Sequence, residues 1–472
     1  MADHISFDTI PGSIRVPGQS IEFNTRNAVQ GLPQNPQKML IIAPMLTAGR
    51  QAALTPVQLF SDADAADLFG GGSWAHLMTR QAFLNNPYLD LTVIGVADGG
   101  GSVAATASVS LSGTATGSGI VTIRIGGKAY SVAVASGEAA AAVATRIRAA
   151  VTADSAAVAT TGGADGALVF TMKNKGQIGN EPQFDVAVAV AGLSQSGGTG
   201  FASGAGDADI APALAKVAGK QYHIIVSAFN DDANNKALSS HISQVSNAIE
   251  QRGCVGVIGW RGTLATGTAA TAKINDGRVV CGWYKNAAES GCMIAAGLGA
   301  VMAFEEDPAR PLNTLEVKGL AVTADADWPL FAECNNALYN GLTPLTVVAG
   351  KVQIMRAVST YTKSAANADD PSLLDITTIR TLDYVRRAIK ERIALRFPRD
   401  KLSDNMVPSV RSEILDVLYK LEEIEVIENV EANKPKLLLS RSVQDANRLN
   451  AAIPSDVVNG LHVFAGRIDL IL

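Results

Sequence analysis

The sequence has few of the residues that build metal, disulfide or catalytic-triad sites. Its 472 residues include four cysteines and five histidines. No CxxC pair occurs, and no cysteine lies close to a histidine pair of the kind that binds zinc. We therefore expect no metal site, no cofactor and four buried, reduced thiols, which are Cys254, Cys281, Cys292 and Cys334.

A signal peptide and a long apolar run are also missing. The N-terminal segment MADHISFDTIPGSIRVPG carries acids and prolines where a signal peptide has a basic start and an apolar stretch. The longest apolar run, Cys292 to Phe304, is shorter than the roughly 20 residues that span a bilayer. We expect neither export by that route nor membrane insertion. The net charge of −5 argues against a nucleic-acid partner, because binding phosphates needs a surplus of Lys and Arg.

Catalytic motifs are absent as well. The glycine-rich stretches at Gly70 and Trp260 lack the spacing of a phosphate loop or a dinucleotide fingerprint, and neither GxSxG nor HExxH occurs. The acidic residues 305–307 could hold a cation, although a solvated helix end is the simpler interpretation. A hydrolase on the α/β core remains an alternative, and its triad would need His223 or His241.

Strand-like and helix-like segments alternate along much of the chain. KMLIIAP, at Lys38 to Pro44, is a short apolar run that suits a buried strand. A helical stretch follows, with Ser61 as its N-cap, and the glycines from Gly70 interrupt it. The later runs QYHIIVSAFND, CVGVIGW and DGRVVCGWY also alternate with helical stretches. This order favours a mainly parallel sheet covered by helices.

The stretch from Gly99 to Gly206 differs in composition, being rich in Ala, Gly, Ser, Thr and Val. Two alternating runs flank Gly126 and Gly127, which predicts a hairpin because glycines readily adopt the positive φ of such turns. EAAAAVATRIRAAVTAD predicts a helix after it. We therefore expect a small β-rich α+β module inserted into the α/β core.

A long helix, DITTIRTLDYVRRAIKERIALRF, dominates the C-terminal part. Apolar residues recur along it at helical spacing, and Arg386, Arg387 and Lys390 form what we call its basic face. An acidic block follows between Glu422 and Glu431. Such separated charges suit docking on a complementary surface, in this subunit or a neighbour, and solvated faces of one fold remain an equal alternative.

The chain ends in GLHVFAGRIDLIL, which predicts a strand over residues 460–472. Apolar side chains alternate along it and share one face, namely Phe464, Ile468, Leu470 and Leu472. The sequence as a whole predicts five segments: a terminal arm at 1–36, core parts at 37–98 and 207–344, the inserted module at 99–206, and an α+β C-terminal domain with a terminal arm at 345–472.

Four stretches in order carry a family resemblance: IPGSIRVPGQSIEFN, TPVQLFSDADAADLFGGGS, DPARPLNTLEVKGL and LDITTIRTLDYVRRAIKERIALRFPRDKL. Together they resemble the contractile tail sheath proteins of the phage Mu type. The resemblance implies a structural protein without catalytic activity, built on a subtilisin-like α/β core. Copies would stack around a tail tube and contract to drive it through a bacterial envelope. Another self-assembling phage or envelope protein is the alternative.

The resemblance also implies partners and contact residues. The partners would be other copies of the chain, the tail tube protein, and the baseplate and tail terminator proteins, in a virion tail assembled in the host cytoplasm. The basic face of Arg386, Arg387 and Lys390 would meet an acidic surface on the tube side. The inter-subunit strands would use Val463, Phe464, Ile468, Leu470 and Leu472 at one end, and Ile14 and Val16 at the other.

Overall fold

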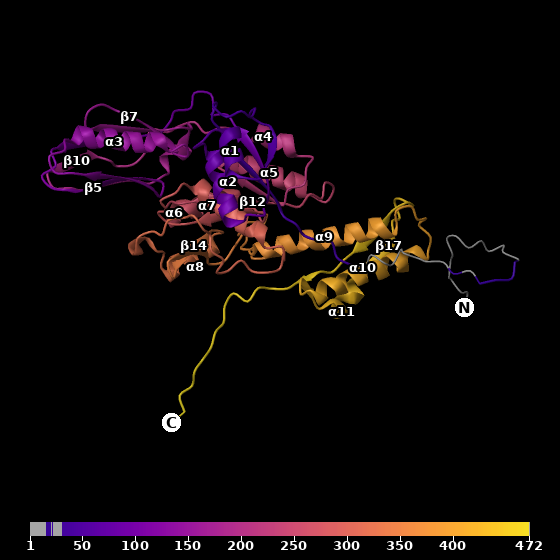
Figure 1. Cartoon of the computed structure of the whole chain (residues 1–472). Helices are drawn as coiled ribbons and strands as arrows, with labels where there is room; N and C mark the ends of the chain where they lie inside the picture. Colours follow the sequence, from indigo (N-terminus) through magenta and orange to yellow (C-terminus); the bar gives the residue numbers. More distant parts are fainter. Residues whose placement is uncertain (1–15, 20, 22–30, 472) are drawn as a thin grey trace. The chain divides into compact units, whose positions relative to one another are not determined.

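A computed structural model of the chain describes residues 16–19, 21 and 31–471 (Figure 1). Ile14 and Leu472 lie outside these residues. The fold is mixed α/β and divides into two compact units. The larger unit comprises residues 35–383 and 457–472, and the smaller unit comprises residues 384–456 with the described residues up to Gln34.

An eight-stranded sheet forms the centre of the larger unit, with the order β15-β14-β13-β12-β11-β1-β3-β2. All neighbours from β14 to β3 in this order pair in parallel, and only the edge strands β2 and β15 are antiparallel. This confirms the predicted mainly parallel sheet. The strands are β1 (Lys38–Pro44), β2 (Pro56–Leu59), β3 (Asp90–Val96), β11 (Ile224–Ser227), β12 (Val255–Trp260), β13 (Val279–Trp283), β14 (Thr343–Val348) and β15 (Lys351–Ile354).

Helices pack against this sheet. The apolar helix α7 contacts α2, β11 and β12, and nearly all of its side chains are buried. Ser61 caps α1, since its side chain accepts a hydrogen bond from the Asp64 N–H at 3.1 Å, as the sequence predicts. The helices of this unit around the sheet are α1 (Asp62–Phe69), α2 (Trp74–Asn85), α4 (Ala211–Val217), α5 (Asp232–Ser246), α6 (Leu264–Ile274), α7 (Gly291–Phe304) and α8 (Phe331–Tyr339).

Residues 106–197 form two further sheets, ordered β10-β4-β8-β7 and β6-β5-β9, beside helix α3 (Ala140–Ala153). Their buried side chains make a hydrophobic cluster separate from that of the eight-stranded sheet. Gly126 and Gly127 turn the predicted hairpin with φ of 54° and 81°. The strands are β4 (Thr106–Gly113), β5 (Gly119–Ile125), β6 (Lys128–Val134), β7 (Ala159–Gly162), β8 (Ala167–Met172), β9 (Phe184–Ala189) and β10 (Leu193–Gly197).

The long predicted helix is present as α9 (Ile376–Arg396), and its residues from Tyr384 onward belong to the smaller unit. There α9 packs against α10 (Met406–Glu423), a helix that the sequence analysis did not predict. A short helix α11 (Val430–Asn433) and the hairpin β17 (Leu438–Arg441) with β18 (Leu449–Ala452) complete the unit. The two-residue strands are β16 (Ile427–Glu428) and β19 (Asp456–Val457).

Candidate assembly interface

The C-terminal segment from residue 458 to residue 471 contains neither helix nor strand in the single chain (Figure 1). The predicted strand over residues 460–472 is therefore wrong for the isolated subunit. The physical reason is that a strand exists only beside a partner edge, and the segment pairs with none among the residues that the structure describes. Its apolar side chains are almost fully exposed, at 78% for Val463, 87% for Phe464, 100% for Ile468 and 83% for Leu470.

The start of this segment is held on the larger unit by contacts of His462. The His462 side chain is only 13% exposed, and its Nε2 lies 3.4 Å from Asp375 Oδ1. Its Nδ1 lies 2.9 Å from Asn313 Nδ2. Asp375 is also held by two hydrogen bonds from Arg356, at 2.8 and 2.7 Å. We call these four residues the His462 anchor, and the exposed apolar run begins directly after it.

The electrostatics of the anchor favour an uncharged ring. Burial lowers the pKa of His462 most, Arg356 lowers it further, and Asp375 opposes both. A neutral ring fits the geometry, since Nδ1 can then accept a hydrogen bond from Asn313 while Nε2 carries the proton that faces Asp375. The 3.4 Å contact lacks the alignment of a hydrogen bond and is mainly electrostatic.

In the N-terminal arm, Leu32 packs against the core of the smaller unit, and the other described large apolar residues are Val16 and Ile21. Both side chains are exposed, at 79% and 84%. In the smaller unit, the Pro33 carbonyl oxygen accepts a hydrogen bond from the Tyr384 hydroxyl at 2.9 Å. The Gln34 carbonyl oxygen accepts one from Arg387 at 3.0 Å. The last part of the arm is thus bound to α9.

The three residues of the predicted basic face differ in their surroundings. Arg387 lies over the Tyr384 ring at 5.4 Å and 4.0 Å from Glu391, so it is engaged within its own unit. Arg386 is partly buried, and Lys390 is exposed. Of the three side chains, Lys390 is therefore the most accessible to a partner.

A partly buried ion-pair network, which the sequence analysis did not predict, joins α9 to α10. Arg392 has a side chain only 4% exposed and contacts Glu413 at 3.1 Å and Asp416 at 2.6 Å. Arg396 contacts Glu413 at 3.3 Å, and Lys420 contacts Asp416 at 2.6 Å. Part of the positive charge of α9 is thus neutralised within the subunit, by residues upstream of the predicted acidic block.

The β17–β18 hairpin has two edges without a third strand among the described residues. Leu439 and Leu449 pack against the core of the smaller unit, while Leu438 is 64% exposed. A two-stranded hairpin is marginal alone and presents unpaired backbone groups along each edge.

The glycine-rich loop before α2 shows no free anion cradle. The Gly72 N–H donates to His76 Nδ1 at 3.0 Å, the Trp74 N–H to Asn174 Oδ1 at 3.1 Å, and the His76 N–H to Ser73 Oγ at 3.1 Å. The stretch at Trp260 leads into α6, whose first turn is capped by the Thr263 side chain. Both stretches are accounted for as helix entries.

The two histidines considered for a triad and the acidic residues 305–307 lie in ordinary structural positions. His223 accepts a hydrogen bond from the Lys38 N–H at 3.0 Å beside β11, and His241 lies half-buried on α5. Arg380 is buried and donates to the carbonyl oxygens of Met302 and Glu305, so a guanidinium caps the helix end at residues 305–307.

Metal sites and membrane-spanning helices can be looked for only among the residues that the structure describes. Across those residues, no group of three His, Cys, Asp or Glu side chains is arranged to hold a metal ion. Over the same ranges, every helix is too short or too polar to cross a bilayer. The four cysteines are buried, as expected, and no disulfide joins them in the structure.

Comparisons with known proteins match most of the chain. The model of the phage tail sheath protein central domain matches residues 203–360, and that of the phage tail sheath C-terminal domain matches residues 368–471. The Mu-like prophage FluMu tail sheath protein of Haemophilus influenzae is 30% identical over 487 residues, which cover 99% of this chain and 100% of that protein.

Solved structures share the fold. The sheath tail protein of Desulfitobacterium hafniense has a TM-score of 0.53 at 15% identity, covering 94% of this chain and 97% of its own. The sheath tail protein of Listeria innocua has a TM-score of 0.50 at 15% identity, covering 92% of this chain and 94% of its own. A chain of the PVC sheath complex, an extracellular contractile injection system in its contracted state, has a TM-score of 0.52 at 9% identity. The match covers 97% of this chain and 98% of that chain. Taken with the full-length relative, these matches show that the chain belongs to the contractile phage tail sheath proteins.

Proposed function

We propose that copies of this sheath subunit polymerise around a tail tube by exchanging terminal strands, and that the polymer contracts to drive the tube through a bacterial envelope during genome delivery. The observation that carries this proposal is the group of exposed apolar side chains in residues 463–471, directly after the largely buried His462 side chain. Several exposed large apolar residues close together are typical of an interaction site, whereas single exposed apolar residues are common.

The acceptor in our proposal is the β17–β18 hairpin of a neighbouring copy. Ordering an extended segment costs about 1–2 kcal/mol of backbone entropy per residue, and each main-chain hydrogen bond returns only about 1 kcal/mol. Strand pairing alone therefore does not hold the arm. Burial of Phe464, Ile468 and Leu470 on one face would add about 1.5–3 kcal/mol for each side chain and supplies the stabilisation that pairing alone lacks.

The same geometry suits contraction. The anchor fixes the root of the arm on one subunit, while the strand would be held by the next. Backbone between the two fixed points can change its dihedral angles, so neighbouring subunits could rotate without separating. The N-terminal arm, with Ile14 and Val16, would add a further strand to the acceptor sheet.

The module expected at residues 99–206 is, in our proposal, an insertion that faces outward from a subtilisin-like core. The hydrogen bonds between the first and the last residues of the module support this proposal. The Val103 N–H donates to the Ala205 carbonyl oxygen at 2.9 Å, and the Thr106 N–H donates to the Ala202 carbonyl oxygen at 2.9 Å. Entry and exit thus lie side by side, as an inserted module requires.

The remaining partners follow from the family. We infer that the sheath meets an acidic surface of the tail tube protein through the basic face, with Lys390 as its most exposed member. Baseplate and tail terminator proteins would contact the two ends of the polymer. The assembly would form in the host cytoplasm and act as part of the virion tail, without nucleic acid as a partner and without catalysis.

The test is removal of the terminal strand. Deleting residues 463–472, or replacing Phe464 and Ile468 by serine, should abolish the long cylinders that the intact protein forms in electron micrographs. The melting temperature of the unassembled subunit should stay unchanged, because these side chains are exposed in the single chain. Ile249→Ser, at a side chain 88% exposed on another surface, is the matched control and should polymerise normally.

Two outcomes of this test would count against us. Unchanged polymerisation after the deletion would refute the strand-exchange proposal. Cylinders of a single fixed length and width, before and after a contraction trigger, would favour another self-assembling structural protein over a contractile sheath.

A further inference from the structure

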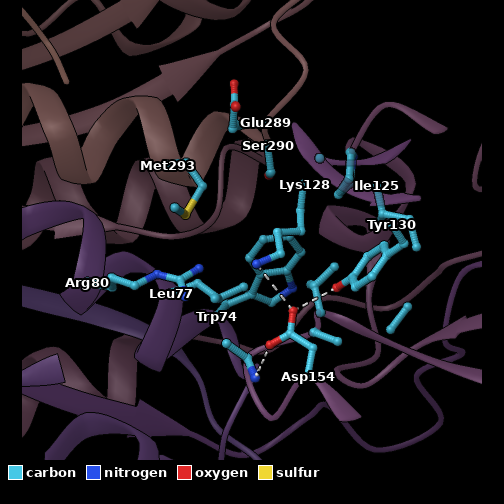
Figure 2. A pocket seen from close by; sticks show the side chains of 16 residues that line it. Trp74, Leu77, Arg80, Ile125, Lys128, Tyr130, Asp154, Glu289, Ser290 and Met293 are labelled. Atoms are coloured by element: carbon cyan, nitrogen blue, oxygen red, sulfur yellow. Dashed lines mark hydrogen bonds and ion pairs between the residues drawn. The ribbon is translucent and has the colours of Figure 1, made fainter. Parts of the chain in front are cut away.

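A cavity of about 80 Å³ lies within the larger unit (Figure 2). One side comes from α2 and the start of α7, including Leu77 and Met293. The opposite side comes from the β5–β6 hairpin and the turn after α3, including Ile125, Lys128 and Asp154. The lining therefore combines apolar side chains with charged ones, and it joins the region of residues 106–197 to the elements beside the eight-stranded sheet.

Trp74 brings an unused hydrogen-bond donor to this cavity. Its side chain is only 3% exposed, and Nε1 is buried without a partner among the residues that the structure describes. The Trp74 backbone is held at the start of α2, because its N–H donates to Asn174 Oδ1 at 3.1 Å. Native proteins rarely leave a buried N–H unsatisfied, so an acceptor is expected at this point.

The charged side chains that line the cavity are Arg80, Lys128, Asp154 and Glu289, two of each sign. Asp154 accepts hydrogen bonds from the Tyr130 hydroxyl at 2.9 Å and the Ala156 N–H at 3.0 Å, and its Oδ2 lies 3.6 Å from Lys128 Nζ. Arg80 forms neither a hydrogen bond nor an ion pair with any described residue, and Figure 2 shows it extending toward Leu77 and Trp74.

The other carboxyl group of the lining faces elsewhere. Glu289 Oε1 accepts a hydrogen bond from the Ala321 N–H at 3.0 Å, and Figure 2 shows its carboxyl group pointing away from Asp154. Its Oε2 is buried without a partner among the described residues, and burial raises the pKa of this carboxyl. The cavity therefore offers an N–H donor and a guanidinium, while the carboxylate nearest to them, Asp154, is held by Lys128 and Tyr130.

We propose that this cavity binds a small organic carboxylate, which accepts hydrogen bonds from Trp74 Nε1 and Arg80 and rests its apolar end on Leu77, Ile125 and Met293. The volume limits the ligand. A protein cavity of about 150 Å³ holds benzene, so one of about 80 Å³ suits an anion of the size of acetate or propionate. Such a ligand would link the β5–β6 hairpin to α2 and would stabilise that junction by binding the folded chain.

The experiment uses the full-length chain labelled with 5-fluorotryptophan. The sequence has four tryptophans, so four ¹⁹F signals are expected, and Trp74→Phe identifies the one from Trp74. Titration with sodium propionate, against sodium chloride at equal ionic strength, should shift the Trp74 signal saturably and leave the other three in place. Absence of a saturable shift would overturn the proposal.

Variants and other anions make the test specific. Arg80→Gln should raise the Kd about tenfold, equivalent to about 1.4 kcal/mol. Arg50→Gln should not change it, because Arg50 is exposed and paired with Asp67 at 3.1 Å. Benzoate should be excluded by its size. Equal binding by Arg80→Gln would mean adventitious binding only, and equally strong shifts with inorganic phosphate would refute the assignment to a carboxylate.

Discussion

His462 makes the attachment of the C-terminal segment sensitive to pH. Its pKa is lowered from 6.5, first by burial and then by Arg356, while Asp375 opposes the shift. In the released segment the ring is exposed and keeps its ordinary pKa. The released state therefore binds the proton more readily than the anchored state. Anchoring is complete above about pH 6.5 and weakens as the pH falls through that value.

A spin label just after the anchor reports this change. Val463→Cys places a thiol on the exposed side of the anchor, whereas the four native cysteines are buried, and burial raises the pKa of Cys254 and Cys281 to about 12. The mobility of the label should increase between pH 7.5 and pH 5. In the His462→Asn background it should not depend on pH. An identical pH dependence in both backgrounds would show that another group titrates.

The α9–α10 pair is the element whose stability depends most clearly on charge. Removing one partner of a buried ion pair costs about 3–5 kcal/mol. Arg392→Met should destabilise the pair by less, about 2 kcal/mol, because Arg396 still contacts Glu413 and Lys420 still contacts Asp416. Hydrogen exchange of α10 amides in the full chain measures this, since two compact units make global unfolding unsuitable.

The control for this pair lies two residues away on α9. Lys390→Met also removes one positive charge, but from an exposed side chain, so α10 protection should change by less than about 0.5 kcal/mol. If both variants accelerate exchange equally, net charge and not the buried network stabilises the helices.

Elements with local signals could be predicted from the sequence. The apolar run of β1, the stripe of α9 and the glycine pair of the β5–β6 hairpin each specify a structure through neighbouring residues. α10 carries such a stripe too, with Ile414, Leu418 and Leu421 buried, but the sequence analysis did not identify it as a helix.

Features that depend on distant residues could not be predicted in this way. The His462 anchor joins positions 149 residues apart, and no local pattern marks His462 as buried. The terminal strand was expected from alternation alone, although strand formation needs an edge that the segment itself does not contain. Family resemblance filled part of this gap, because it points to neighbouring copies as the source of such an edge.

At the scale of the whole molecule, the larger unit contains two hydrophobic clusters that share few residues. One surrounds the eight-stranded sheet, and the other holds the two sheets and α3 of residues 106–197, with fully buried residues such as Phe170. The connections between them include Asn174, which donates to the Met45 carbonyl oxygen at 2.9 Å and accepts from the Trp74 N–H. Two separate cores predict that each part can fold without the other.

Residues 99–206, produced alone, should therefore unfold in one cooperative thermal transition. Conversely, a chain in which residues 103–205 are replaced by two glycines should still form the sheath polymer, because Ser102 and Gly206 are hydrogen-bonded and closing so short a loop costs little. Asn174→Ala in the intact chain is the control for loss of the connecting hydrogen bonds alone. A fragment without a cooperative transition, or a shortened chain that fails to fold, would show that the two cores depend on each other.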